Sequence, residues 1–420
     1  MERPADAVAD GRKSPRGASQ VLLVVEQLRR RVPGGVGTYA RGLIKGLSTL
    51  EGPSGVEVVL HASRFGRRLG GTVSGRRSDA PRSGDPLEEF GITTELSRLP
   101  SRVLTRAWDH GWVSAPKGFP VVHSVSTAFP GVVGSSLDGG GRGAGGAQAL
   151  VVCVHDVAWR RYPESTTKRG RSWHESALRR AIASAQVLVV PSAATARDVI
   201  DAGAREDRIS VMTEGADHLP PPDVDAARSL LERRGVKGDY LLSVGTLEPR
   251  KNVAGLVQAY RAASSALGGE VPLVVVGPRG WGGREPGAVD VVYLGPVSLS
   301  ILAGLYRLAR TFVYVPLVEG YGLPPLEAMR SRVPVVVSSE VPSVSYRAGD
   351  FSRGDEAEPR RRFALSVDAR DVDEIADAIV VASTDDSVRA ELIEAGSELA
   401  SSRTWRRCAL EHVDIWKTLG

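Results

Sequence analysis

Short apolar runs divide the chain, and each is bounded by turn residues and followed by a stretch with helical periodicity. In the first half these runs read VLLVVE, VEVVLH, PVVHS, ALVVCVHD and QVLVVPS, and in the second half YLLSVG, VPLVVVG, VVYLG, TFVYVP and VPVVVSS. Because the runs are continuously apolar rather than alternating, we expect strands buried on both faces, as in parallel sheets covered by helices. Two such series predict an α/β protein with two doubly wound parallel-sheet units.

A proline-rich segment separates the two series. The stretch DHLPPPDVD, residues 217–225, contains three consecutive prolines and predicts a stiff connector before the helical pattern AARSLLERRG. We therefore expect the following organisation: a disordered tail over residues 1–19, a first domain over 20–217, a linker over 218–225, a second domain over 226–400 and a C-terminal helical segment over 401–420.

Composition narrows the class of protein. With 420 residues, 42% of them hydrophobic and 25% charged, the chain is long enough for two globular domains, each with its own core. The formal charge of +5, from 54 basic and 49 acidic residues, favours anionic partners. Only two cysteines occur, which excludes a disulfide framework and indicates the reducing cytoplasm. From the polar first twenty residues and the lack of a long uncharged apolar run, we expect neither a signal peptide nor a membrane span.

Candidate binding residues in the first half follow predicted strands, where ligands of open parallel sheets bind. The stretch RVPGGVGTYARGL opens an amphipathic helix, and Gly35 and Gly37 would let the backbone approach a ligand closely. A purely structural turn is the alternative interpretation. Further along, His155 and Asp156 end a buried strand. A histidine there can hydrogen-bond a substrate, or it can be a satisfied structural residue.

Two stretches of the second half carry unusual charges. Arg250 and Lys251, in SVGTLEPRKN, stand at a predicted helix start, where cations oppose the helix dipole. They fit there if an anion such as a diphosphate lies between them and the helix, the alternative being a solvated surface pair. The stretch VEGYGLPPLEAM sets Glu319 and Glu327 eight positions apart, with more glycines, prolines and acids than a strand-to-helix connection needs. This excess predicts a binding loop, although Glu327 could simply stabilise a helix start.

A metal site is not expected. The Asp-x-Asp pairs at 223–225 and 371–373 could in principle hold a divalent ion, but both directly precede helical patterns. Helix N-capping explains aspartates in that position. We predict no metal and no cofactor.

The motifs occur in an order that resembles retaining glycosyltransferases of family 4, which have the GT-B fold of two Rossmann-like domains facing a central cleft. The resemblance rests on the E-x7-E pattern of Glu319 and Glu327, with SVGTLEPRKN, LAGLYRLA and VPVVVSS around it. In the first half it rests on the glycine-rich loop, the VVHSVSTAFP stretch and the strand-ending His155-Asp156.

The resemblance implies a role for each candidate residue. Arg250 and Lys251 would hold the diphosphate of a nucleotide-sugar donor, Glu327 would bind its ribose hydroxyls and Glu319 would face its sugar. His155 would hydrogen-bond the donor sugar near the reacting centre. The backbone positions that would contact donor or acceptor are Gly35, Gly37, Gly245, Tyr321, Gly322 and Leu323.

The function implied is transfer of a hexose, with mannose favoured, from a nucleotide sugar to a lipid-linked, polysaccharide or small glycoside acceptor. Two departures from the family's common pattern are Thr246, where many members have arginine, and Ser343, where many have glutamate. The alternatives are another GT-B enzyme, such as a nucleotide-sugar epimerase, and a non-catalytic sugar-nucleotide-binding protein. Nucleic acid is not an expected partner.

A basic stretch over residues 160–182 contains Arg160, Arg161, Lys168, Arg169, Arg171, Arg179 and Arg180 against Glu164 and Glu175. With aromatic residues interleaved, it predicts peripheral contact with the anionic inner face of the plasma membrane. A solvated helix face is the alternative. Residues 62–115, 139–148 and 352–362 receive no function.

Overall fold

The structure is a computed structural model that describes residues 19–420 except 31, 51–55, 65–84, 135–146, 270, 281–290 and 345–361. Most of the tail expected over 1–19, most of the glycine-rich segment at 139–148 and nearly all of the charged insertion at 352–362 lie outside the described residues.

Seven parallel strands form the first sheet, in the order β3-β2-β1-β4-β5-β6-β7. The strand order reverses direction between β1 and β4, which is where doubly wound sheets open a crevice for ligands. The strands are β1 (Ser19–Val24), β2 (Val56–Ser63), β3 (Thr94–Ser97), β4 (Val121–Ser124), β5 (Ala149–Cys153), β6 (Val187–Val190) and β7 (Ile209–Val211).

The second sheet has six parallel strands in the order β10-β9-β8-β11-β12-β13, with the same reversal between β8 and β11. Its strands are β8 (Leu241–Val244), β9 (Leu273–Val276), β10 (Val291–Gly295), β11 (Thr311–Tyr314), β12 (Val335–Ser338) and β13 (Leu365–Val367). The expected α/β class with two parallel-sheet units is confirmed.

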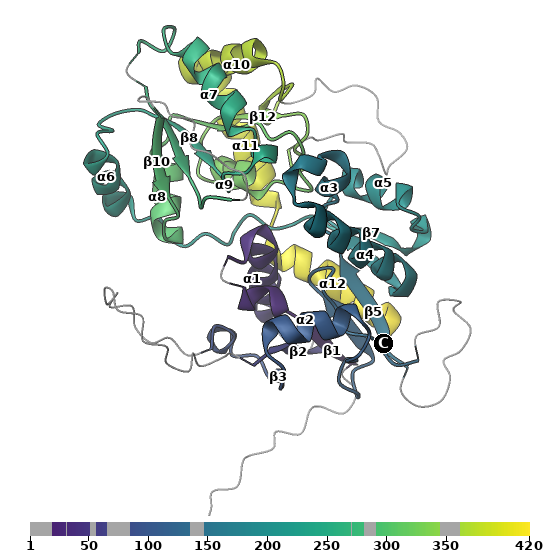
Figure 1. The fold of residues 1–420 in the computed structure, drawn as a ribbon. Coiled ribbons are helices and arrows are strands. Elements are labelled where there is room, and N and C mark those ends of the chain that lie inside the picture. The colour runs from purple at the N-terminus through teal and green to yellow at the C-terminus, as the bar shows by residue number, and fades with distance from the viewer. Residues whose placement is uncertain are drawn as a thin grey trace, which may run out of the picture.

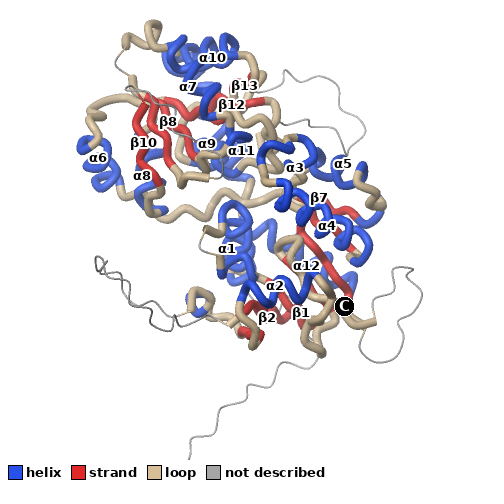
Figure 2. The backbone as a smooth tube through the Cα atoms, viewed as in Figure 1, coloured by secondary structure: helices blue, strands red, loops and turns tan. Residues whose placement is uncertain are grey.

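Helices cover both faces of each sheet, so the continuously apolar strands are buried on both sides (Figures 1 and 2). The α-helices are α1 (Gly34–Ser48), α2 (Ser101–Asp109), α3 (Ala158–Arg161), α4 (Lys168–Ser184), α5 (Ala193–Asp201), α6 (Val224–Arg233), α7 (Val253–Ala263), α8 (Leu299–Leu308), α9 (Leu323–Arg330), α10 (Val372–Thr384), α11 (Asp386–Ser402) and α12 (Trp405–Leu419). The 3-10 turns are η1 (Glu26–Arg29), η2 (Glu88–Phe90), η3 (Pro163–Ser165), η4 (Glu206–Arg208) and η5 (Pro249–Lys251).

The last helix returns to the first domain. In Figure 1 the yellow α12 lies beside the purple α1, and the two helices pack against each other. The helices can approach closely because Gly42 of α1 has no side chain: a Cβ at this position would lie 2.1 Å from the ring of Trp405. A Cβ on Gly215, in the segment that joins the domains, would lie 2.2 Å from the backbone nitrogen of Trp405. The chain passes from the first domain to the second near Gly215 and returns to the first domain between α11 and α12. Both connections therefore lie against Trp405.

Every apolar run quoted from the sequence contains a strand, and the described residues form three further strands that the apolar pattern did not predict. These are β3, β7 and β13, each at the edge of a sheet. Their residues are largely half-exposed, so they lack the continuous apolar run that marks a central strand.

Both cysteines, Cys153 and Cys408, are buried free thiols. Among the described helices, none combines the length and the apolar character needed to cross a bilayer.

Candidate active site between the two domains

A cavity of about 540 Å³ lies between the two domains, at the carboxyl ends of strands from both sheets. One wall comes from the start of α1 and from the loop after β5, and the other from the loops after β8, β9 and β11. The structure brings every residue proposed from the sequence to this one cavity. They are Gly35, Gly37, His155, Gly245, Arg250, Lys251, Glu319, Tyr321, Gly322, Leu323 and Glu327.

Arg250 and Lys251 form a buried cluster of charges with Glu319. Lys251 Nζ donates to the Glu319 carboxylate and lies 2.7 Å from the hydroxyl of Tyr314, which itself donates to Glu319 at 2.8 Å. Arg250 lies 3.5 Å from Glu319 and 2.9 Å from Glu248. Because the side chains of Arg250 and Lys251 are only 18% and 11% exposed, the alternative of a solvated surface pair is wrong.

Electrostatics keep Glu319 ionised despite its burial. Removal from water would raise the pKa of this carboxyl, but Lys251 and Arg250 outweigh that effect and lower it to about 2. Burial and the neighbouring Arg250 lower the pKa of Lys251. Glu319 therefore fixes the positions of two cations that point into the cavity, which the sequence did not reveal.

Glu327 occupies a different environment. Helix α9 begins after Gly322, whose φ of 97° is in the left-handed region that glycine tolerates, and Pro324 follows in the first turn, where proline suits a helix start. Glu327 accepts a hydrogen bond of 2.7 Å from Tyr306 and lies 2.9 Å from His218 Nε2. These two partners hold a buried carboxylate at the wall of the cavity.

His155 stands on the opposite wall, directly after β5. Its Nε2 lies 2.9 Å from the carbonyl oxygen of Val125, which can only accept, so Nε2 carries a proton. Nδ1 lies 3.5 Å from the carboxylate of Glu214, so both ring nitrogens have a partner within the protein. Burial acts to lower the pKa of His155, but the hydrogen bond and charge of Glu214 outweigh it, and the pKa is raised.

Gly320 joins the two walls. A Cβ at this position would lie 1.9 Å from the carbonyl oxygen of His155, so only glycine allows the loop after β11 to touch the loop after β5. Its own carbonyl oxygen accepts hydrogen bonds from Ser192 at 2.8 Å and Thr195 at 3.3 Å, at the start of α5. The E-x7-E loop is thus a contact between the domains as well as a wall of the cavity.

Comparison with known proteins agrees with this architecture. Residues 33–218 match the family model for Glycosyltransferase Family 4, and residues 232–399 match that for Glycosyl transferases group 1. The O-antigen chain mannosyltransferase B of Escherichia coli is 31% identical over 286 residues, covering 65% of this chain and 71% of that protein. The chain belongs to the family 4, group 1 glycosyltransferases.

Two more comparisons are narrower in what they show. The serotype-specific mannosyltransferase WbdA of E. coli is 32% identical over 116 residues, which is 24% of this chain but 14% of WbdA. The crystal structure of Anabaena HepE in complex with UDP and glucose superposes with a TM-score of 0.63 at 16% identity, over 96% of this chain and 100% of HepE. The latter shows that the glycosyltransferase shares its GT-B fold with solved structures.

Among the cavity residues of this glycosyltransferase that sequence reasoning missed are Glu214 and His218. Glu214 lies shortly after β7 and contacts His155, and His218 lies at the start of the proline-rich segment and contacts Glu327. A polar residue after a strand was the available signal, but β7 is a short edge strand, so its end was not recognised.

The first aspartate of each Asp-x-Asp pair caps a helix, as predicted. Asp223 accepts from the backbone N–H of Ala226, and Asp371 accepts from the N–H groups of Asp373 and Glu374. Both carboxylates are therefore bound to their own helices.

One buried group of described residues, His123, Cys153 and His412, has ligand atoms within 4.8 Å of one another. The hydrogen bonds do not suit a metal. His123 Nδ1 accepts from the indole N–H of Trp416 at 2.9 Å, so a metal on Nε2 would require an imidazolate. His412 Nε2 lies 2.7 Å from the hydroxyl of Tyr39, and burial raises the pKa of Cys153 to about 12, which keeps the thiol protonated. This group is a hydrogen-bond network that attaches α12 to the first domain.

Proposed function

We propose that this glycosyltransferase is a retaining hexosyltransferase that uses a nucleotide-sugar donor and a lipid-linked, polysaccharide or small glycoside acceptor. One observation carries the proposal: two buried cations, the two acids of the E-x7-E loop and His155 face a single cavity between the domains. The mannosyltransferase B and WbdA relatives favour mannose as the sugar and O-antigen-like polysaccharide as the product.

Each side chain has a chemical task in this proposal. Arg250 and Lys251 bind the donor diphosphate and stabilise the negative charge that develops as the bond from the anomeric carbon to the phosphate oxygen breaks. Glu327 accepts hydrogen bonds from the vicinal ribose hydroxyls, and His155, which lines the same cavity, lies on the side of the sugar. The acceptor oxygen bonds to the anomeric carbon from the side that the phosphate leaves. Its proton passes to a phosphate oxygen, which gives the glycoside and a nucleoside diphosphate.

Metal independence is part of the proposal. The charge that a divalent ion would neutralise is met by Arg250 and Lys251, and the first aspartate of each Asp-x-Asp pair caps a helix. Transfer is therefore expected to continue in excess EDTA.

For location, we propose a cytoplasmic protein with peripheral contact to an anionic membrane surface. Two tryptophans at the basic stretch are held within the protein: Trp159 is buried and stacks on His174, while the indole N–H of Trp173 donates to Asp109 at 2.8 Å. Membrane contact would thus depend mainly on the basic side chains, and would weaken with salt.

A donor screen tests the function. Thermal shift with GDP-mannose, UDP-glucose, UDP-N-acetylglucosamine and dTDP-rhamnose identifies the donor, because only a ligand of the folded state raises the melting temperature. Mass spectrometry then follows donor hydrolysis and glycoside formation in the parent and in Arg250→Ala/Lys251→Ala. Turnover by the parent that the variant loses supports a transferase. Binding without turnover would instead favour a non-catalytic protein, and an altered but uncleaved donor would favour an epimerase.

A further inference from the structure

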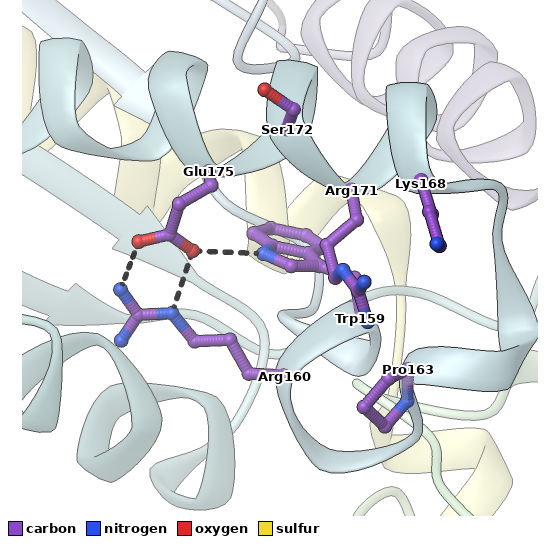
Figure 3. A pocket seen from close by; sticks show the side chains of 7 residues that line it. All are labelled: Trp159, Arg160, Pro163, Lys168, Arg171, Ser172 and Glu175. Atoms are coloured by element: carbon purple, nitrogen blue, oxygen red, sulfur yellow. Dashed lines mark hydrogen bonds and ion pairs between the residues drawn. The ribbon is translucent and has the colours of Figure 1, made fainter.

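A second cavity of about 540 Å³ lies on the first domain, beside α3, η3 and the start of α4 (Figure 3). It is open to solvent and sits within the basic stretch. Its lining residues are Trp159, Arg160, Pro163, Lys168, Arg171, Ser172 and Glu175. The function proposed above gives this cavity no task.

One side of the cavity is internally paired. The Arg160 guanidinium forms two hydrogen bonds with the Glu175 carboxylate, which also accepts from the indole N–H of Trp159 at 3.2 Å. The hydrogen bond from Arg160 is the main reason that the pKa of Glu175 falls to about 2. The only acid of the lining is therefore ionised and already bound.

The other side is not paired. Figure 3 shows Lys168 and Arg171 extending from the first turn of α4 toward the side of Pro163, away from the Arg160–Glu175 pair. Within the described part of the chain, neither side chain has a hydrogen bond or an ion pair. Three basic residues and one acidic residue line the cavity, so its net charge is 3 minus 1, or +2.

This cavity adjoins the active-site cleft. Asp156 lines the cleft, and Trp159, three residues further on, lines the second cavity. The turn η3, which contributes Pro163, packs against η5, which carries Arg250 and Lys251. An ion pair of 2.7 Å between Arg161 of α3 and Glu340 after β12 joins the domains at the same place. A molecule bound here would extend from the first domain toward the donor.

We propose that this pocket binds the phosphate groups of an anionic acceptor, such as the diphosphate that joins a glycan to its lipid carrier. This inference rests on the proposed function, because it assumes an acceptor that enters from the first domain. Lys168 supplies a mobile point charge and Arg171 a planar fork of donors, a combination that suits phosphate oxygens. The volume of the pocket is in the range of small-ligand sites.

The test compares Lys168→Gln/Arg171→Gln with a matched control, Arg169→Gln/Arg197→Gln. The control removes the same charge from exposed residues of α4 and α5 that do not line the pocket. Two acceptors are used: a mannosyl diphosphate carrying a short polyprenyl chain, and the methyl glycoside of the same sugar. We expect the pocket variant to raise KM for the diphosphate acceptor about tenfold or more, from the loss of charge-assisted hydrogen bonds. In the same variant, the KM for the methyl glycoside, the kcat and the rate of donor hydrolysis should change little. The control variant should have the same kinetic constants as the parent.

Calorimetric titration with the diphosphate acceptor provides a readout that needs no turnover. It is carried out in the Arg250→Ala/Lys251→Ala background, so that the diphosphate cannot bind at the donor site. Weaker binding in the pocket variant supports the proposal even if the parent proves unable to cleave a donor, an outcome that would refute only the proposed function. Unchanged affinity and KM would overturn the phosphate pocket.

Sedimentation with phosphatidylglycerol vesicles separates the two sources of phosphate. If the pocket variant loses vesicle binding beyond the control while KM stays unchanged, the pocket binds lipid headgroups and the acceptor assignment is wrong. If vesicle binding falls equally in both variants while KM rises only in the pocket variant, the acceptor assignment holds.

Discussion

At the scale of single residues, the two acids of the E-x7-E loop have different tasks. Glu319 is surrounded by Lys251, Arg250 and Tyr314, so its charge organises the cations that would meet the diphosphate. Glu327 has neutral or titratable partners, Tyr306 and His218. Its carboxylate is therefore better placed to accept hydrogen bonds from a ligand.

Replacing Glu327 with glutamine keeps the side-chain shape but weakens charge-assisted hydrogen bonds to the ribose. Donor affinity should fall by about 1.5 to 3 kcal/mol, measured by isothermal titration calorimetry. The melting temperature without donor serves as the control for folding. A donor affinity equal to that of the parent would remove Glu327 from the binding site.

Glu214→Gln tests the electrostatic partner of His155. Glu214 and Asp156 are the acids that raise the pKa of this histidine, and Glu214 has the larger effect. We expect the glutamine variant to lower the pKa of His155 in an NMR titration, and Asp156→Asn to lower it less. An equal or larger change in Asp156→Asn would contradict the pairing with Glu214.

The same pair has a consequence for stability. The pKa of His155 in the folded protein is raised above its ordinary value of 6.5. The contribution of the His155–Glu214 pair to the free energy of unfolding is therefore complete below pH 6.5, and it is lost as the pH rises through the pKa of the folded state. Denaturant unfolding should therefore show the largest deficit of Glu214→Gln between about pH 5 and 6.5, and a smaller one at pH 9. A loss of stability that grows with pH would show that burial, and not Glu214, has the larger effect on the pKa of His155.

At the scale of elements, the contact between α1 and α12 decides how the C-terminus is held. Trp405 lies against the glycine face of α1, and the network of His412, Tyr39 and Trp416 fastens the rest of α12. Tyr39 also packs edge-on against His155, with ring centroids 4.7 Å apart. The last helix therefore supports a wall of the active site from behind.

Gly42→Ala should destabilise the protein, although alanine favours an isolated helix. The added Cβ would lie 2.1 Å from the Trp405 ring, and such overpacking costs about 1 to 3 kcal/mol. Chemical denaturation measures the loss. Gly35→Ala, in the same helix with no atom near its Cβ, is the control for stability and should unfold like the parent or slightly later. A Gly42→Ala variant as stable as the control would mean that α12 is loosely docked.

At the scale of the whole molecule, the two domains are held against each other through the loop after β11. Gly320 touches His155 across the cleft and accepts hydrogen bonds from α5. The candidate active site is therefore complete only while the two domains are in contact, since its residues come from both domains.

Gly320→Ala should hold the domains apart, because its Cβ would overlap the His155 carbonyl. We expect a larger radius of gyration by small-angle X-ray scattering and a fall in turnover of about a hundredfold, the usual effect of displacing catalytic groups by an ångström. Ser192→Ala, which removes one hydrogen bond to Gly320 and adds no bulk, should change both quantities much less. If the two variants behave alike, the close approach at Gly320 is not what keeps the cleft closed.

The apolar pattern of the chain was enough to locate the central strands and the candidate residues that follow them. A strand between two neighbours in a covered parallel sheet must be apolar on both faces, so its signal is continuous and its end is easy to find. His155, Gly245, Arg250 and Glu319 follow such strands, and the common polarity of a parallel sheet gathers strand ends at one edge.

Other features of the fold and of the site depend on neighbours that are distant in sequence, and they became visible only in the folded protein. The edge strands β3, β7 and β13 are half-exposed, so their sequences do not differ from those of loops. Glu214 and His218 acquire a role only because the chain crosses between the domains beside His155 and Glu327. The close contacts of Gly320 and Gly42 likewise come from segments far away in sequence. Local patterns record the burial of a residue's own element, whereas these contacts depend on how elements pack, which no local pattern encodes.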